Sequence, residues 1–202
     1  MKKQALTAVF LLSLIISMSS CSKDDDCVES TWYEDSDNDG FGNPEVTKLS
    51  CDQPANFVAN SSDVDDTDPN LNPNTVWQGP KITFTKENYA DWTQEANQDR
   101  ITDNVWITRK DKKGIFNIVT ETSYSDFVSP ADTEWAIGTT AEISDLTFLS
   151  WEDASGSEPP ALVNQDMVVH LIKDNLYMDI KFTSWQSGGQ GGGFSYERST
   201  KN

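Results

Sequence analysis

Histidine, cysteine and basic side chains are all scarce in this sequence. His170 is the one histidine among 202 residues, so a histidine-rich metal site is excluded. Only 15 lysines and arginines stand against 33 aspartates and glutamates, which gives a formal net charge of −18. Nucleic acids require a basic footprint on the protein that binds them, so this charge argues against nucleic-acid binding. It argues equally against electrostatic attachment to an anionic lipid surface.

Long apolar runs are also lacking beyond the first residues of the chain. Residues 5–18 form one apolar run after two N-terminal lysines, and its length is that of a signal peptide rather than a membrane span. The run leads into Ser-Ser-Cys at Cys21, and small residues directly before a cysteine resemble a bacterial lipobox. The resemblance implies that residues 1–20 are removed and that acyl chains such as palmitate anchor Cys21 in the outer membrane. The alternative is an ordinary secretory leader.

Residues 21–28 form a short tether after this leader. Lys23 and three consecutive aspartates at 24–26 make it highly charged, which predicts a solvated segment. It resembles the acidic tag that follows the lipidated cysteine in lipoproteins exported by some Gram-negative bacteria. We therefore expect the protein to be exposed at the cell surface.

The acidic side chains gather in two short loops. Residues 22–75 hold 14 acidic and 2 basic side chains. Carboxylates packed this closely repel one another, and Ca²⁺ relieves the repulsion by taking about six to eight oxygen ligands. The sequence therefore predicts a calcium-binding module over residues 29–75. The segment has little apolar periodicity, so we expect it to be small and irregular. Its candidate carboxylate ligands are Asp35, Asp37, Asp39, Asp63, Asp65, Asp66 and Asp68.

The first loop matches only the beginning of an EF-hand. Three alternating aspartates at 35–39 and Gly40 fit the start of the pattern, and Phe41 would add its backbone carbonyl. The twelfth position is Val46 instead of glutamate, and Pro44 is incompatible with the helix that leaves an EF-hand loop. The missing ligands must come from the second loop, which would complete one site or two. The alternative is a solvated acidic linker.

Taken together, residues 31–73 resemble a metal-binding repeat of bacterial surface proteins, related in style to thrombospondin type 3 calcium repeats. The matching features are Thr-Trp-Tyr before the first loop, Phe-Gly-Asn-Pro after it, and the second acidic run. That family has been linked with copper as well as calcium. Oxygen ligands without histidine, methionine or a free thiol favour Ca²⁺ here. One departure is Val64, which stands where the family usually has a cysteine.

Two of the three cysteines, Cys27 and Cys51, bracket the first acidic loop. In an exported protein such a pair predicts a disulfide, which for a loop of this length would contribute about 3–4 kcal/mol. The resemblance implies that Cys27 replaces the missing cysteine as the partner of Cys51. The alternative is a pair of free thiols.

The composition changes after residues 70–80, which contain two prolines and one glycine and mark a domain boundary. Short alternating or apolar segments follow, and Leu176, Met178, Ile180 and Phe182 would share one strand face. We expect a mainly β fold, with an antiparallel β-sandwich or jelly-roll-like domain over residues 76–202. One or two helical turns are allowed at 88–98. The expected strands cover residues 81–85, 105–108, 115–119, 135–137, 146–151, 167–172, 176–182 and 194–198.

No local motif in this domain predicts catalysis. The sequence has no Gly-x-Ser-x-Gly and no spare cysteine, and the glycine-rich stretch 188–193 lacks the Lys-Ser/Thr ending of a phosphate loop. Trp106 and Trp185 are candidates for sugar stacking, although core packing is the simpler interpretation. Segments 134–139 and 194–200 resemble a terminal module of secreted bacterial proteins, and this resemblance assigns no function to the chain. Carboxylates considered for glycoside hydrolysis are Glu121, Glu134, Asp179 and Glu197.

The sequence thus predicts a non-catalytic surface lipoprotein. Its calcium-stabilised neck would present a β-sandwich for adhesion or binding to an unknown extracellular ligand, either protein or glycan. The alternative is a secreted carbohydrate-active enzyme or carbohydrate-binding module.

Overall fold

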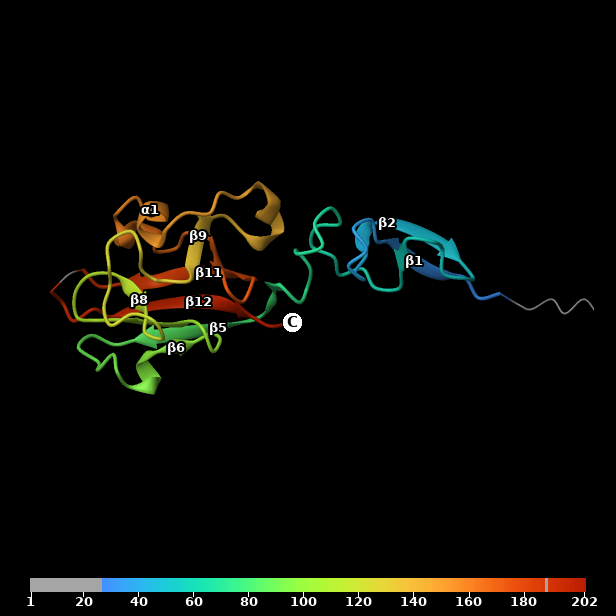
Figure 1. Ribbon diagram of the computed structural model, residues 1–202. Coiled ribbons are helices and arrows are strands. Elements are labelled where there is room, and N and C mark those ends of the chain that lie inside the picture. Colours follow the sequence, from blue (N-terminus) through green and yellow to red (C-terminus); the bar gives the residue numbers. More distant parts are fainter. Residues whose placement is uncertain (1–26, 188) are drawn as a thin grey trace, which may run out of the picture.

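The computed structural model describes residues 27–187 and 189–202 (Figure 1). The predicted leader, the lipidation site Cys21 and the acidic residues 22–26 lie outside the described residues. Within the described part, the chain forms twelve strands, three short 3-10 helices and one short α-helix. The expected mainly β fold is therefore confirmed. Among these described helices, none combines the length and the apolar character needed to cross a membrane.

The N-terminal module is built on a small antiparallel sheet. Strand β1 (Ser30–Glu34) lies between β2 (Asn43–Ser50) and β3 (Phe57–Val58). The low apolar content predicted an irregular module, yet β2 is a regular eight-residue strand with six exposed residues. Backbone hydrogen bonds join β2 to β1, so pairing does not require an apolar face on β2. The sheet holds the first acidic loop between β1 and β2.

The C-terminal domain contains a six-stranded sheet and a three-stranded sheet. The larger sheet is antiparallel except at its shortest strand, β4, which pairs with β11 in parallel. Its consecutive neighbours are β5 (Gly79–Lys86), β12 (Phe194–Thr200), β11 (Leu176–Trp185), β10 (Met167–Leu171) and β9 (Thr133–Ile137), with β4 (Val76–Trp77) beside β11. The smaller antiparallel sheet consists of β6 (Asp99–Arg100), β7 (Trp106–Arg109) and β8 (Ile115–Asn117).

One apolar core joins the two sheets. Ile107 of β7 and Ile115 of β8 belong to the same buried cluster as Met178 and Phe182 of β11. Alternate residues of β11 are buried, as the sequence predicted, because successive side chains point to opposite faces of a strand. Trp135 is fully buried in this cluster. The architecture is therefore sandwich-like, and the glycine-rich stretch lies in the connection between β11 and β12.

One predicted strand was wrong. In residues 146–151, only Leu149 forms an isolated bridge, to Trp135, and Trp151 begins α1 (Trp151–Ala154). Ser150 explains the change, because its side chain accepts a hydrogen bond from the Asp153 backbone N–H at 3.1 Å and caps the helix. The remaining helices are the 3-10 segments η1 (Glu95–Asn97), η2 (Thr140–Asp145) and η3 (Pro159–Leu162).

An apolar contact connects the N-terminal module to the C-terminal domain. Leu71, Val76 and Ile143 form a buried cluster, and the half-buried Val64 packs against it. Val64 thus contributes apolar surface at the position where the resembled repeat has cysteine. The Asn202 side chain donates to the Val76 carbonyl at 3.4 Å, so the segment before β5 is also held by polar contacts. In Figure 1 this connecting segment runs between the sheet of the N-terminal module and the C-terminal domain.

Candidate metal centre

The two acidic loops lie against each other through backbone and asparagine hydrogen bonds. Asn60 Nδ2 donates to the Gly40 carbonyl at 2.8 Å, and the Asp63 N–H donates to the Gly42 carbonyl at 3.2 Å. The Asp35 N–H donates to the Asn56 carbonyl at 2.8 Å. These bonds join residues about twenty positions apart, so they fix the second loop beside the first.

Gly42 allows this close approach because it has no side chain. A Cβ at this position would lie 2.6 Å from the Asn60 carbonyl oxygen, 2.6 Å from Tyr33 Cβ and 2.8 Å from Val58 Cγ2. Gly40 has a different role, since its φ of +92° lies in the region that glycine adopts without strain. The two glycines therefore turn the first loop and admit the second.

Five of the seven predicted carboxylates meet in two overlapping groups. Asp37, Asp39 and Asp63 form one group, in which one ligand oxygen from each residue lies within 4.8 Å of the others. The second group has the same spacing. It consists of Asp35, Asp37 and Asp66. Because Asp37 belongs to both groups, the two clusters are continuous.

The carboxylate oxygens of the first group divide into two sets. In Asp37, Asp39 and Asp63, Oδ1 accepts a hydrogen bond from the backbone N–H two residues later, at 2.8–3.2 Å. Oδ2 of each is buried without a hydrogen-bond partner among the described residues. Oδ1 of Asp35, a residue only 7% exposed, is also buried and unpartnered within the described chain.

Four buried carboxylate oxygens without partners are costly unless another group satisfies them. They lie in groups of the size and spacing that hold a metal ion. Every donor is an oxygen, which suits a hard divalent cation. The residues present therefore fit a bound metal ion.

The electrostatics of the groups point in the same direction. Burial, together with the nearby Asp39 and Asp37 carboxylates, raises the pKa of Asp63 to about 6. Burial and the surrounding carboxylates also raise the pKa of Asp37. Both shifts reflect negative charge placed close together away from water. A cation at this position would oppose them.

Asp65 and Asp68 do not join either group. Asp65 Oδ1 accepts from the Thr67 hydroxyl at 2.6 Å and from its N–H at 3.1 Å. Asp68 Oδ1 accepts from both the backbone and side-chain N–H groups of Asn70 at 3.0 and 2.9 Å. These two aspartates therefore stabilise turns in the second loop.

Ser36 and Asn60 contribute to the site although no sequence pattern singles them out. Ser36 donates from its N–H and its hydroxyl to the two carboxylate oxygens of Asp66, at 2.7 and 2.9 Å, and so orients Asp66. Asn60 bridges the loops through Gly40. Serine and asparagine are common in any polar loop, so neither stands out by type. The Phe41 N–H donates to Asp39 Oδ1, which places Phe41 at the end of the first loop.

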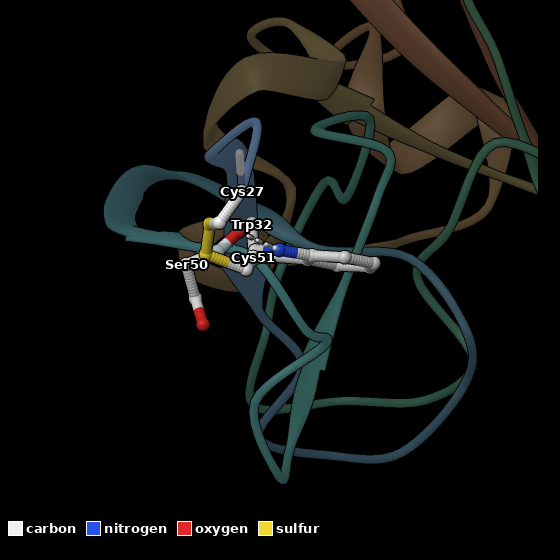
Figure 2. Close-up of a disulfide and its surroundings, with 4 residues drawn as sticks. All are labelled: Cys27, Trp32, Ser50 and Cys51. Carbon is white, nitrogen blue, oxygen red and sulfur yellow. Dashed lines mark hydrogen bonds between the residues drawn. A yellow bond between two sulfur atoms is a disulfide. The ribbon is translucent and has the colours of Figure 1, made fainter. Parts of the chain in front are cut away.

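Cys27 and Cys51 form a disulfide at the end of the sheet in the N-terminal module (Figure 2). Their Cα atoms are 5.7 Å apart. Beside them, the Trp32 indole N–H donates to the Ser50 carbonyl at 3.1 Å. The disulfide and this hydrogen bond join the start of β1 to the end of β2.

Three of the four carboxylates considered for glycoside hydrolysis have structural partners. Glu121 accepts from the N–H groups of Asn117 and Ala131 at 2.7 and 2.8 Å. Asp179 accepts from the Thr140 N–H at 2.7 Å. Glu134 lies 2.7 Å from Nδ1 of His170. Glu197 lies on β12 opposite Lys181 and Thr83 of the neighbouring strands.

Comparison with protein families, curated proteins and solved structures gave no match for this chain. The assignment of a metal centre therefore depends on the chemistry of the residues themselves. Five convergent carboxylates, four of them with a buried unpartnered oxygen, are its basis.

Proposed function

We propose that residues 29–75 bind Ca²⁺ and form a neck that presents the C-terminal domain for extracellular binding or adhesion. The observation that carries the proposal is the set of four buried, unpartnered carboxylate oxygens in the two acidic groups. Ca²⁺ accepts many oxygen ligands in a flexible geometry, whereas Mg²⁺ demands a near-ideal octahedron and keeps several waters. Copper and zinc favour imidazole or thiolate ligands, which these groups do not contain.

The first ion would be held by Asp37, Asp39 and Asp63, each through Oδ2. The Phe41 carbonyl is the backbone ligand expected from the EF-like loop. Asp35 and Asp66 would bind a second ion together with Asp37, or would complete the first. Bound Ca²⁺ supplies positive charge that satisfies the buried oxygens and links the two loops.

Calorimetric titration with Ca²⁺ tests the site through two variants that remove equal charge. In Asp37→Asn/Asp39→Asn, the amide oxygen can keep the Oδ1 hydrogen bonds, but an NH₂ group replaces each unpartnered Oδ2. We expect the wild type to bind at about 10⁻⁴–10⁻³ M, the range of extracellular modules, and this variant to show no saturable heat.

The control is Asp65→Asn/Asp68→Asn, which changes two aspartates that lie outside both groups. It should bind Ca²⁺ within about threefold of the wild type, because only long-range attraction is lost. Equal affinity in the two variants would refute the assignment of ligands. Absence of binding by the wild type at millimolar Ca²⁺ would refute the calcium site.

The proposed location is the outer membrane, through a lipid on Cys21. The supporting observation is the lipobox-like sequence before Cys21. Cys21→Ala should abolish incorporation of labelled palmitate and release the protein from membranes. Replacing Lys23 and residues 24–26 with alanine should leave lipidation intact but protect the protein from protease added to whole cells. Unchanged protease access would argue against the surface-export role of the tether.

A carbohydrate-binding module is the second candidate. It is favoured by aromatic side chains that line two hollows in the C-terminal domain, among them Trp92, Tyr124 and Trp185. Such rings can stack on the apolar C–H faces of a sugar.

A further inference from the structure

A basic turn interrupts the otherwise acidic C-terminal domain. Four of the five residues at 109–113 are lysine or arginine, whereas residues 76–202 contain more acidic than basic side chains overall. The turn connects β7 and β8 in the three-stranded sheet of the C-terminal domain. Lys112 and Lys113 are exposed, and Lys110 Nζ lies 4.4 Å from the centre of the Trp92 ring. Positive charge is therefore concentrated beside an aromatic side chain.

Two adjacent hollows open at this turn. Their volumes are about 500 and 360 Å³, and they share Lys113, Gly114 and Tyr124. Pockets of several hundred Å³ accommodate small organic ligands. Gly114 lets the walls come together, because a Cβ there would lie 2.5 Å from the Tyr124 ring and 2.7 Å from the Trp151 ring. The hollows therefore form one groove, which we call the basic groove.

Arg109 lies in the wall of the basic groove and is only 2% exposed. Its guanidinium carbon is 3.7 Å from the centre of the Trp185 ring. Nε donates to the Lys113 carbonyl at 2.8 Å, and Nη1 donates to the carbonyls of Gln186 and Gly193 at 2.9 and 3.2 Å.

Nη2, the remaining nitrogen of Arg109, donates no hydrogen bond to residues 27–187 and 189–202, and it is not among the fully buried unpartnered atoms of these residues. Nor does a carboxylate of these residues lie within ion-pair distance of the guanidinium. Burial lowers the pKa of Arg109 to about 10, so the group stays charged at neutral pH. A buried charge without a counter-ion is unfavourable, and an anion in the groove would relieve it.

The acidic residues along the groove are partly committed to other contacts. Glu152 accepts hydrogen bonds from the Tyr124 hydroxyl and from the Phe127 N–H. Asp126 lies 3.9 Å from Lys113 Nζ in an exposed ion pair. Asp111 is exposed on the turn itself. Neither Asp111 nor Asp126 neutralises Arg109.

We propose that the basic groove binds an anionic saccharide, whose carboxylate or sulfate contacts Arg109 and the turn lysines while its ring packs against the groove aromatics. Arginine suits carboxylate and sulfate because its nitrogens present directed donors. The aromatic rings and the concave shape of the groove favour a sugar over an acidic peptide as the ligand. The proposal gives a ligand class to the extracellular binding role proposed above and rests on that role.

Titration of the whole chain after the predicted leader with a galacturonic acid trimer tests the proposal. Its methyl ester is the matched neutral ligand, and a sulfated disaccharide distinguishes sulfate from carboxylate. We expect saturable binding of at least one anionic sugar and at least tenfold weaker binding of the ester.

Lys112→Gln/Lys113→Gln should weaken this binding about tenfold, the factor that corresponds to roughly 1.4 kcal/mol for two partly exposed ion pairs. Lys81→Gln/Lys201→Gln removes the same charge from exposed sites away from the groove and should change affinity less than about twofold. Arg109→Lys keeps the charge, but a single ammonium group cannot hold the three backbone carbonyls and also donate to a ligand, so this variant should bind more weakly if circular dichroism shows it folded.

Three results would overturn the basic groove as a saccharide site. They are equal binding of acid and ester, equal loss in both lysine variants, and absence of saturable binding by any anionic sugar. Preference for polyglutamate over the sugars would identify an acidic peptide as the ligand instead. Asp37→Asn/Asp39→Asn should bind the sugar normally, so failure of the calcium site and failure of the groove are separately visible.

Discussion

At the scale of single residues, the candidate metal centre depends on which oxygen of each aspartate is free. Asp37, Asp39 and Asp63 use Oδ1 to accept a local backbone hydrogen bond, and this bond aims Oδ2 into the cluster. Asp65 uses the same kind of turn but lies outside the cluster. Residue type does not make this difference, because all four residues are aspartates.

Gly42→Ala should weaken Ca²⁺ binding without changing any ligand. The added Cβ would lie within 2.6–2.8 Å of three neighbouring atoms, so the two loops must separate. We expect the module to lose about 1–3 kcal/mol of stability, as other overpacked sites do. Calorimetric titration with Ca²⁺ measures the loss of affinity. A wild-type affinity would show that the loops do not need this contact.

Asp99→Asn should strongly destabilise the C-terminal domain. Asp99 is buried with Arg198, to which its two oxygens are joined at 2.6 and 2.9 Å. Removing one charge leaves the guanidinium buried and uncompensated, which costs about 3–5 kcal/mol. Urea unfolding measures the change. The matched control is Glu95→Gln, which breaks an exposed pair with Arg100 and should cost less than about 1 kcal/mol. Similar losses in both variants would contradict this account.

The sequence allowed the prediction of carboxylates and their spacing, but not their final partners. Alternating aspartates at 35–39 predicted a cluster, because Gly40 turns the chain back. The sequence pattern could not show that Asp63 joins the cluster and Asp65 does not, since both residues follow the same local pattern. The basic turn is visible in the sequence, because four of the five residues at 109–113 are basic in a chain that is otherwise acidic. Its significance depends on Arg109 being buried, which only the fold reveals.

At the scale of elements, strands were predictable where one face is buried. Alternation in β11 predicted its inward side chains correctly, because a two-residue period matches the pleat of a strand. Residues 146–151 were predicted as a strand because they are apolar, but Ser150 starts α1 there. The exposed β2 has no apolar period to reveal it. The apolar period of the sequence therefore predicts strands that pack against the core. It misses elements that are formed by backbone pairing, such as β2, or by helix capping, such as α1.

Cys27→Ser/Cys51→Ser should loosen the sheet of the N-terminal module and leave the six-stranded sheet of the C-terminal domain unchanged. The disulfide joins the start of β1 to the end of β2, and a loop of this length contributes about 3–4 kcal/mol through the unfolded chain. Hydrogen exchange should therefore accelerate at β1 and β2 amides. Calcium should restore part of the protection, since the ion proposed above would also link the loops. Unchanged exchange at β1 and β2 would contradict a stabilising role for the disulfide.

At the scale of the whole molecule, two stabilising strategies are joined in one chain. The C-terminal domain has a buried core that spans both of its sheets. The N-terminal module has little apolar core and relies on a disulfide, loop hydrogen bonds and the acidic centre. The apolar cluster around Leu71 and Val76 connects them.

Removing calcium should therefore unfold the N-terminal module first. Scanning calorimetry should show two transitions, and only the lower one should move when a chelator replaces Ca²⁺. An ion at one hundred times its Kd stabilises the state that binds it by about 2.7 kcal/mol. Asp37→Asn/Asp39→Asn should show the chelated profile even with calcium present. A single transition that shifts as a whole would mean that the two parts unfold together.

The joined loops also determine how the molecule responds to being pulled. Between the disulfide and Asp63, force can follow a short route along β1 and across a bound cation, or a long route along the chain from Cys51. While the cation holds, the short route carries the load. Once it leaves and β3 separates from β1, the stretch from Cys51 to Asp63 can lengthen to at most about 40 Å. The N-terminal module would then act as an extensible joint, whose reach under tension would depend on the calcium ion proposed above.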